Sequence, residues 1–110
     1  MGKYAVKKIG IVERYQEYLP VTDKTPIISL NEGNTPLILA EALPVELGLK
    51  NIRIYYKFEG LNPTGSFKDR QVSAGISHAR ETGADTVAVV SSGNVAASCA
   101  SSSRTSTSPT

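Results

Sequence analysis

Apolar and polar positions along this chain follow two spacings, which predict its helices and strands. Residues 11–19 carry apolar and aromatic side chains at helical spacing, and Pro20 ends this predicted helix. Pro and Gly residues indicate irregular structure across 20–36. Residues 37–39 are predicted to form a short strand, and 40–47 a short helix.

The second half of the chain alternates strands with helices. Residues 52–58 are rich in β-branched and aromatic side chains and predict a strand. Residues 66–82 predict a helix, and 86–90 form an unbroken apolar run typical of a strand covered on both faces. Another helix is predicted to open at 95–98. One apolar stripe marks the first of these helices: Val72, Ile76 and Ala79.

Both ends of the predicted 66–82 helix carry boundary signals. Ser66, followed three residues later by Asp69, resembles a capping box with Asp in place of the usual Glu. Gly83 is well placed as the C-cap glycine. We therefore expect this helix to begin near Ser66 and to stop just before Gly83.

The order strand, helix, strand, helix predicts an α/β fold, an open parallel sheet with flanking helices. Such sheets bind ligands beyond the carboxyl ends of their strands. The loops at 59–66 and 91–94 both follow predicted strands. We therefore expect the two loops to lie at one edge of the sheet and to face one ligand.

The last ten residues differ in composition from the rest of the chain. Apart from Arg104 and Pro109, residues 101–110 are all Ser or Thr. Such a segment buries too little apolar surface to offset its ordering entropy. The sequence thus divides into 1–100, which can fold, and a tail at 101–110 predicted to be disordered. A flexible or modified tail is one interpretation, and an altered reading frame that ends the protein early is the one we favour.

Composition narrows the class of protein. The net charge of +2 is too small and too evenly spread to argue for nucleic acid or an anionic membrane as partner. No run approaches the ~18 apolar residues of a membrane-spanning helix, and the first residues lack the apolar stretch of a secretory signal. The single cysteine, Cys99, excludes an internal disulfide and, with one His, makes a metal site improbable. We expect a cytoplasmic protein that takes difficult chemistry from a cofactor.

Lys68 is the first candidate for chemistry. It lies in the first turn of a predicted helix, where the positive end of the macrodipole favours a neutral amine. A neutral lysine amine can form a Schiff base with an aldehyde cofactor. An ordinary lysine paired with Asp69 or Glu59 remains the alternative. A nucleotide phosphate loop is disfavoured, because that motif needs Lys directly after its second Gly, here Gly65.

The second candidate is the loop at 91–94, which reads Ser-Ser-Gly-Asn ahead of a helix. Hydroxyls and free backbone N–H groups at a helix N-terminus can bind an anion such as a substrate carboxylate. Asn94 can donate to the phenolic oxygen of a cofactor. A simple capped turn is the alternative, and it is common.

Three strings together resemble the threonine synthase family. Residues 30–37 read Leu-Asn-Glu-Gly-Asn-Thr-Pro-Leu, 57–70 read Lys-Phe-Glu-Gly-Leu-Asn-Pro-Thr-Gly-Ser-Phe-Lys-Asp-Arg, and 91–94 read Ser-Ser-Gly-Asn. Threonine synthases are pyridoxal-phosphate enzymes of the tryptophan-synthase-β class, fold type II. The resemblance covers roughly residues 10–98, and Gln71 departs from the Gly usual in the family at that position.

The resemblance implies a role for each matching residue. Lys68 is the catalytic lysine that binds pyridoxal 5'-phosphate covalently. Asn94 contacts the 3′ oxygen of the cofactor and borders the substrate. Ser91 and Ser92 belong to the loop that receives the substrate carboxylate. The family's Gly-rich loop for the cofactor phosphate has no counterpart in this sequence.

The implied reaction converts O-phospho-L-homoserine and water into L-threonine and phosphate, the last step of threonine biosynthesis. Another fold type II enzyme, such as a serine/threonine dehydratase or a β-replacement synthase, is one alternative. A non-catalytic fragment is the other. We expect the 110-residue chain to be inactive alone, and the resemblance leaves a homodimer open for the full-length family member.

Overall fold

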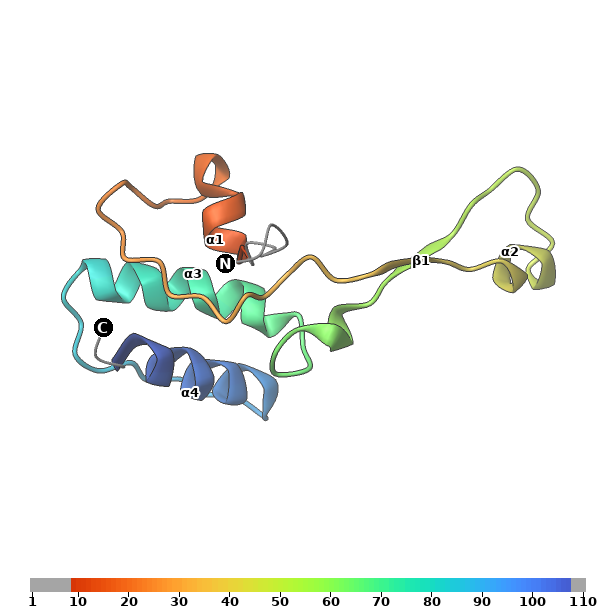
Figure 1. Cartoon of the computed structure of the whole chain (residues 1–110). Helices are drawn as coiled ribbons and strands as arrows, with labels where there is room; N and C mark the ends of the chain where they lie inside the picture. Colours follow the sequence, from red (N-terminus) through yellow and green to blue (C-terminus); the bar gives the residue numbers. More distant parts are fainter. Residues whose placement is uncertain (1–8, 108–110) are drawn as a thin grey trace, which may run out of the picture.

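A computed structural model describes residues 9–107 of the chain. Its elements, in chain order, are α1 (Ile11–Arg14), the 3-10 helix η1 (Gln16–Tyr18), β1 (Leu37–Leu39), α2 (Ala42–Glu46), β2 (Tyr55–Lys57), the 3-10 helix η2 (Glu59–Leu61), α3 (Lys68–Glu81) and α4 (Asn94–Thr107). Figure 1 shows α3 and α4 packed side by side with both N-terminal ends at the same end of the pair. The strands and α2 form an arm, residues 36–58, that reaches away from these helices.

Helix α3 confirms the prediction made from its apolar stripe. Val72 and Ile76 are buried, as expected for residues one turn apart on the face toward the core. The helix ends in a Schellman motif, in which Gly83 N–H donates to the Arg80 carbonyl and Ala84 N–H to the Ala79 carbonyl. Gly83 has a φ of +78°, which explains why glycine ends the helix.

The capping box predicted for the start of α3 is wrong. The Asp69 carboxylate accepts hydrogen bonds from Thr64 instead of reaching the backbone of Ser66. The Ser66 hydroxyl accepts from the Lys68 N–H at 3.2 Å. The first turn is therefore held by the loop that precedes it, and Asp69 becomes available for contacts outside its own helix.

The arm contains the sheet, and its two strands are antiparallel. Leu37 pairs with Lys57 and Leu39 with Tyr55. The predicted parallel arrangement is therefore not seen among residues 9–107. The segment that joins the strands, residues 40–54, turns back on itself through α2, and its length would permit either strand direction, so the pairing of the strands and not the connection decides the arrangement.

The predicted strand at 86–90 is extended but unpaired in the described part of the chain. Its valines are exposed, and Val90 is fully so. A strand needs a neighbour to satisfy its backbone N–H and C=O groups, and here no described segment provides one. The prediction of a strand covered on both faces is therefore wrong for the described residues, because no described segment pairs with 86–90 or covers its valines.

The remaining helices differ from the predictions at their boundaries. The single helix expected at 11–19 is divided into α1 and η1, and the helix expected at 40–47 is shortened to α2. Helix α4 continues to Thr107, further than the sequence pattern predicts, and includes part of the Ser/Thr-rich segment. Residues 108–110 of that segment lie outside the described residues.

The interior is small and unusually polar. Among residues 9–107, the buried apolar residues are Ile11, Val12, Ala40, Pro44, Val72 and Ile76. More polar side chains than apolar ones are buried, among them two acids, Glu32 and Asp69, that are each 1% exposed. Buried polar groups must be hydrogen-bonded to be tolerated, so the hydrogen bonds of these acids largely define the fold. Within residues 9–107, no helix is long and apolar enough to cross a membrane.

Candidate functional site

Lys68 is the first residue of α3 and is half-buried. Its ammonium nitrogen Nζ lies 4.7 Å from the centre of the Phe67 ring, within range of a cation–π contact. The structure thus places the predicted catalytic lysine at a helix N-terminus, as the sequence indicated. What holds this turn in place is a pair of acidic residues, one on each side of it.

Asp69 connects the loop before α3 to helix α4. Its Oδ2 accepts from the Thr64 N–H at 2.7 Å, and its Oδ1 accepts from the Thr64 hydroxyl at 2.6 Å. Oδ1 also accepts from the hydroxyl of Ser98, at 2.6 Å. Ser98 is completely buried, so this carboxylate is enclosed by three protein donors.

Glu59 forms the second cluster, with Arg70. Arg70 Nε donates to Glu59 Oε2 at 2.7 Å, and Nη2 donates to Oε1 at 2.9 Å, a two-point contact. The Thr35 hydroxyl also donates to Oε1, at 2.6 Å. The hydrogen bonds from Arg70 hold the pKa of Glu59 at about 2, below its usual 4.5, with burial acting in the opposite direction.

These contacts bear on the alternative in which Lys68 is an ordinary ion-paired lysine. Among the residues that the structure describes, Asp69 and Glu59 are bound by other donors, and Lys68 forms no ion pair. The neighbouring acids therefore position the lysine turn without forming an ion pair with Lys68. Neither acid holds the Lys68 side chain.

Asn62 joins the two longer motifs of the sequence. Its Oδ1 accepts from the Gly33 N–H at 2.8 Å, while its Nδ2 donates to Oε2 and to the backbone carbonyl of Glu59, both at 2.9 Å. Gly33 has a φ of +90°, and a Cβ there would lie 2.8 Å from Ile11 Cγ2. The string at 30–37 thus packs directly against the string at 57–70.

Glu32 is a structural residue that the sequence analysis missed. Its Oε1 accepts from the Ile11 N–H at 3.0 Å, which satisfies a free donor at the start of α1. Its Oε2 accepts from the Leu30 N–H at 2.8 Å and the Ser29 hydroxyl at 3.0 Å. The available signal was an acid directly before Gly33, whose positive φ allows the chain to turn tightly around a buried carboxylate.

The second predicted loop, 91–94, lies at the N-terminus of α4 and is exposed. The Ser91 hydroxyl accepts from the Gly93 N–H at 3.0 Å. Ser92 and Asn94 are exposed at the same turn. This is a turn with one internal hydrogen bond and exposed polar groups, and it is compatible with both the anion site and the simpler alternative.

The two candidate loops are brought to one end of the pair formed by α3 and α4 (Figure 1). Ser98 follows Asn94 by one helical turn, and its bond to Asp69 draws the start of α4 toward the start of α3. The predicted residues therefore share an end of the helix pair, and no hydrogen bond among the described residues joins Lys68 to the second loop.

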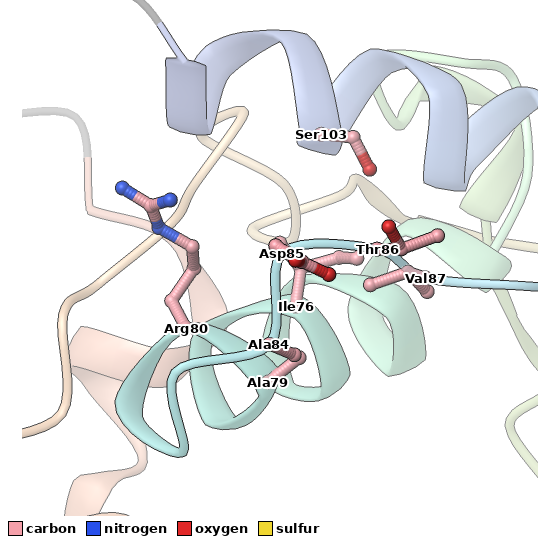
Figure 2. Close-up of a pocket in the computed structure, with 8 residues that line it drawn as sticks. All are labelled: Ile76, Ala79, Arg80, Ala84, Asp85, Thr86, Val87 and Ser103. Atoms are coloured by element: carbon pink, nitrogen blue, oxygen red, sulfur yellow. The ribbon is translucent and has the colours of Figure 1, made fainter.

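The cavities lie elsewhere. One of about 280 Å³ is formed by the C-terminal half of α3, the segment after it and α4. Figure 2 shows residues of that segment and Ser103 of α4 around this space, while the Arg80 side chain extends to one side. Its lining residues are Ile76, Ala79, Arg80, Ala84, Asp85, Thr86, Val87 and Ser103. Another, of about 260 Å³, follows the apolar side of the segment at 87–89. Both of these cavities are lined by residues of the segment 86–90, which other side chains cover only in part, and neither cavity is lined by Lys68.

Acidic, histidine and cysteine side chains are dispersed over the described residues, where no group of three or more gathers to hold a metal ion. His78 lies 3.9 Å from Glu81 and is exposed on α3.

Comparison with known proteins identifies the family. Residues 28–106 match the family described as "Pyridoxal-phosphate dependent enzyme". The chain is 50% identical to the threonine synthase of Synechocystis sp. over 95 residues, which are 86% of this chain and 25% of that protein. It is 48% identical over 91 residues to that of Halalkalibacterium halodurans, covering 83% of the chain and 25% of the relative.

A third relative gives the same result. The threonine synthase of Methanocaldococcus jannaschii is 50% identical over 98 residues, which are 89% of this chain and 24% of that protein. The chain thus spans about a quarter of the length of these curated relatives. Their similarity confirms the resemblance found in the sequence, and the chain belongs to the pyridoxal-phosphate-dependent enzyme family.

Proposed function

We propose that this chain supplies the lysine-bearing part of a threonine synthase, which converts O-phospho-L-homoserine and water into L-threonine and phosphate. The observation that carries the proposal is the position of Lys68 and the absence of an ion pair to it among the described residues. Its amine lies at a helix N-terminus, and both neighbouring acids are bound by other donors. A lysine held in this way fits a covalent cofactor better than it fits a surface ion pair.

The donor set fits pyridoxal phosphate at its aldehyde side. The aldehyde requires an amine, which Lys68 offers, and the phenolic oxygen requires a donor, which the Asn94 amide offers at the same end of the helix pair. When bound, pyridoxal phosphate supplies an electron sink for chemistry at the substrate Cα. Residues 91–94 leave hydroxyl and backbone donors exposed for a carboxylate.

Each of these residues has a distinct task in the proposal. Lys68 binds the cofactor and, when its amine is free, moves a proton at the substrate Cα. Asn94 orients the cofactor ring and lies beside the substrate. Ser91 and Ser92 bind the substrate carboxylate, which fixes the substrate relative to the Lys68 amine.

The complete enzyme is proposed to contain the parallel sheet expected from the sequence. Two helices that run in the same direction and are joined by an extended apolar segment, 86–90, support this arrangement. The uncovered valines of that segment also support the expectation that the 110-residue chain is inactive alone. A cytoplasmic location and a homodimer remain part of the proposal.

A chimera tests the function. The aligned 95-residue segment of the Synechocystis enzyme is replaced by the matching segment of this chain, and phosphate release from O-phospho-L-homoserine is measured together with threonine formation. We expect turnover in the chimera and loss of turnover in its Lys68→Arg variant. Lys50→Arg, at an exposed lysine away from the site, is the matched control and should retain turnover.

Two outcomes would contradict the proposal. Full turnover by the Lys68→Arg chimera would show that Lys68 is not the catalytic lysine. A chimera that deaminates threonine but releases no phosphate from O-phospho-L-homoserine would favour the dehydratase alternative.

A further inference from the structure

We propose that Asp69 and Ser98 form a positioning pair that sets Lys68 relative to the N-terminal turn of α4, where Asn94 lies. The inference rests on the proposed function of Lys68 and Asn94, and it adds two residues that touch neither cofactor nor substrate. In this view, the carboxylate next to the lysine does not assist it chemically. It fixes where the lysine turn lies with respect to the second half of the site.

The contacts of Asp69 are directed to both sides of the lysine turn. Thr64, in the loop that precedes Lys68, donates through its N–H and its hydroxyl. Ser98 donates from α4 at 2.6 Å. Asp69 is 1% exposed and Ser98 is 0% exposed, so water does not compete for these bonds. One carboxylate thereby connects the loop, α3 and α4.

The position of Ser98 on α4 explains how the pair can act on the part of the site that carries Asn94. Asn94 and Ser98 are four residues apart and lie on the same face of α4, one turn from each other. Asp69 directly follows Lys68 in α3. The Asp69–Ser98 hydrogen bond therefore directly connects the elements that carry the lysine amine and the Asn94 amide.

The neighbouring serines of the two helices do not have this role. Ser102 lies one turn further along α4 and is equally buried, but its Oγ has no hydrogen-bond partner in the described structure. Ser77 of α3 is also fully buried, but its hydroxyl bonds to the backbone of Ile28. These two serines provide controls matched in burial and in size.

The test uses the complete 110-residue chain and pyridoxal phosphate. The chain is incubated with the cofactor and reduced with borohydride, and peptide mass spectrometry gives the rate of attachment at Lys68 relative to exposed Lys50. Ser98→Ala should lower this ratio about tenfold, since small misplacements of reacting groups cost one to two orders of magnitude. Asp69→Asn, which replaces one acceptor by a donor facing the Thr64 N–H, should lower it at least as much.

The controls separate positioning from general loosening of the fold. Ser77→Ala removes a buried serine hydrogen bond away from the lysine turn, and Ser102→Ala removes a hydroxyl from the same face of α4. Both should leave the Lys68 to Lys50 ratio within twofold of the parent. An unchanged ratio in Ser98→Ala would overturn the inference, and so would an equal fall in Ser77→Ala.

A second measurement distinguishes failure of the pair from failure of the proposed function. If the parent chain itself shows no preference for Lys68, amide hydrogen exchange decides the inference, and the chimera decides the proposed function separately. The Thr64 N–H donates to the Asp69 carboxylate, which also accepts from Ser98. Ser98→Ala should therefore speed hydrogen exchange of the Thr64 amide about fivefold, which corresponds to the net free energy of one hydrogen bond. Exchange that is unchanged would show that Ser98 does not fix Asp69.

Discussion

Arg70 donates two parallel hydrogen bonds to the carboxylate of Glu59, from Nε to Oε2 at 2.7 Å and from Nη2 to Oε1 at 2.9 Å. The pair links α3 to η2, and a further bond from Arg70 Nη2 to the Thr35 hydroxyl extends it to the segment before β1. Both side chains are about three-quarters covered, which places the pair between an exposed salt bridge and a buried one. Its two-point geometry is specific to a guanidinium group.

Replacing Arg70 with Lys should therefore destabilise the chain although the charge is kept. A lysine ammonium cannot reach both carboxylate oxygens and Thr35 together, so we expect a loss of about 1 to 2 kcal/mol in unfolding free energy. Urea denaturation followed by circular dichroism measures it. Arg80→Lys, at an exposed arginine of the same helix, is the control and should change little. Equal effects of the two substitutions would contradict the role given to the pair.

Acid should weaken the fold through Glu59. Because the hydrogen bonds from Arg70 lower its pKa from 4.5 to about 2, the folded state holds the proton less tightly than the unfolded state does. Stability from this group is fully present above pH 4.5 and is lost as the pH falls toward 2. Glu59→Gln should thus be less stable than the parent at neutral pH and should have a flatter stability profile between pH 4.5 and 2. Parallel profiles for the two proteins would exclude Glu59 as the source.

The parts of the fold that the sequence predicted are those specified by neighbouring residues. The boundaries of α3 follow from a periodic apolar stripe and from Gly83, whose positive φ ends the helix. The position of Lys68 in the first turn follows from the same pattern. These signals act within a few residues, and so no knowledge of the rest of the chain was needed.

The parts that failed depend on partners distant in sequence. The run at 86–90 has the composition of a covered strand, but strand pairing requires a second segment, and none of the described segments provides it. Asp69 stands three residues after Ser66, which favoured a capping box, whereas its actual partner on α4 is 29 residues away. Sequence reasoning placed the chemistry on Lys68 and Asn94 but could not find the hydrogen bonds that bring their helices together.

A buried hydroxyl without a partner makes Ser102 a place where the chain can be stabilised. Its Oγ is fully buried and unbonded in the described structure, so it bears a desolvation cost without the compensating hydrogen bond. Ser102→Ala removes that cost and raises helix propensity, and we expect a gain of about 1 kcal/mol. Thermal unfolding of Ser102→Ala beside Ser98→Ala provides the check, because the second substitution should have the opposite sign. A loss of stability in Ser102→Ala would mean that its hydroxyl is bonded in solution.

Gly33 should tolerate a side chain less well than any glycine in open space. Both Gly33, with φ +90°, and Gly48, with φ +65°, have a backbone that L-residues adopt with strain, so alanine costs about 1 to 2 kcal/mol at either position. At Gly33 the new Cβ would also lie 2.8 Å from Ile11 Cγ2 and 3.2 Å from Arg70 Nη1, whereas at Gly48 it would meet nothing within 4 Å. The added overlap should bring the cost of Gly33→Ala to about 3 kcal/mol or more. Denaturant titration of the two variants isolates the steric part as their difference. If Gly33→Ala lowered the free energy of unfolding no more than Gly48→Ala does, the close packing of Ile11 of α1 against Gly33 would be contradicted.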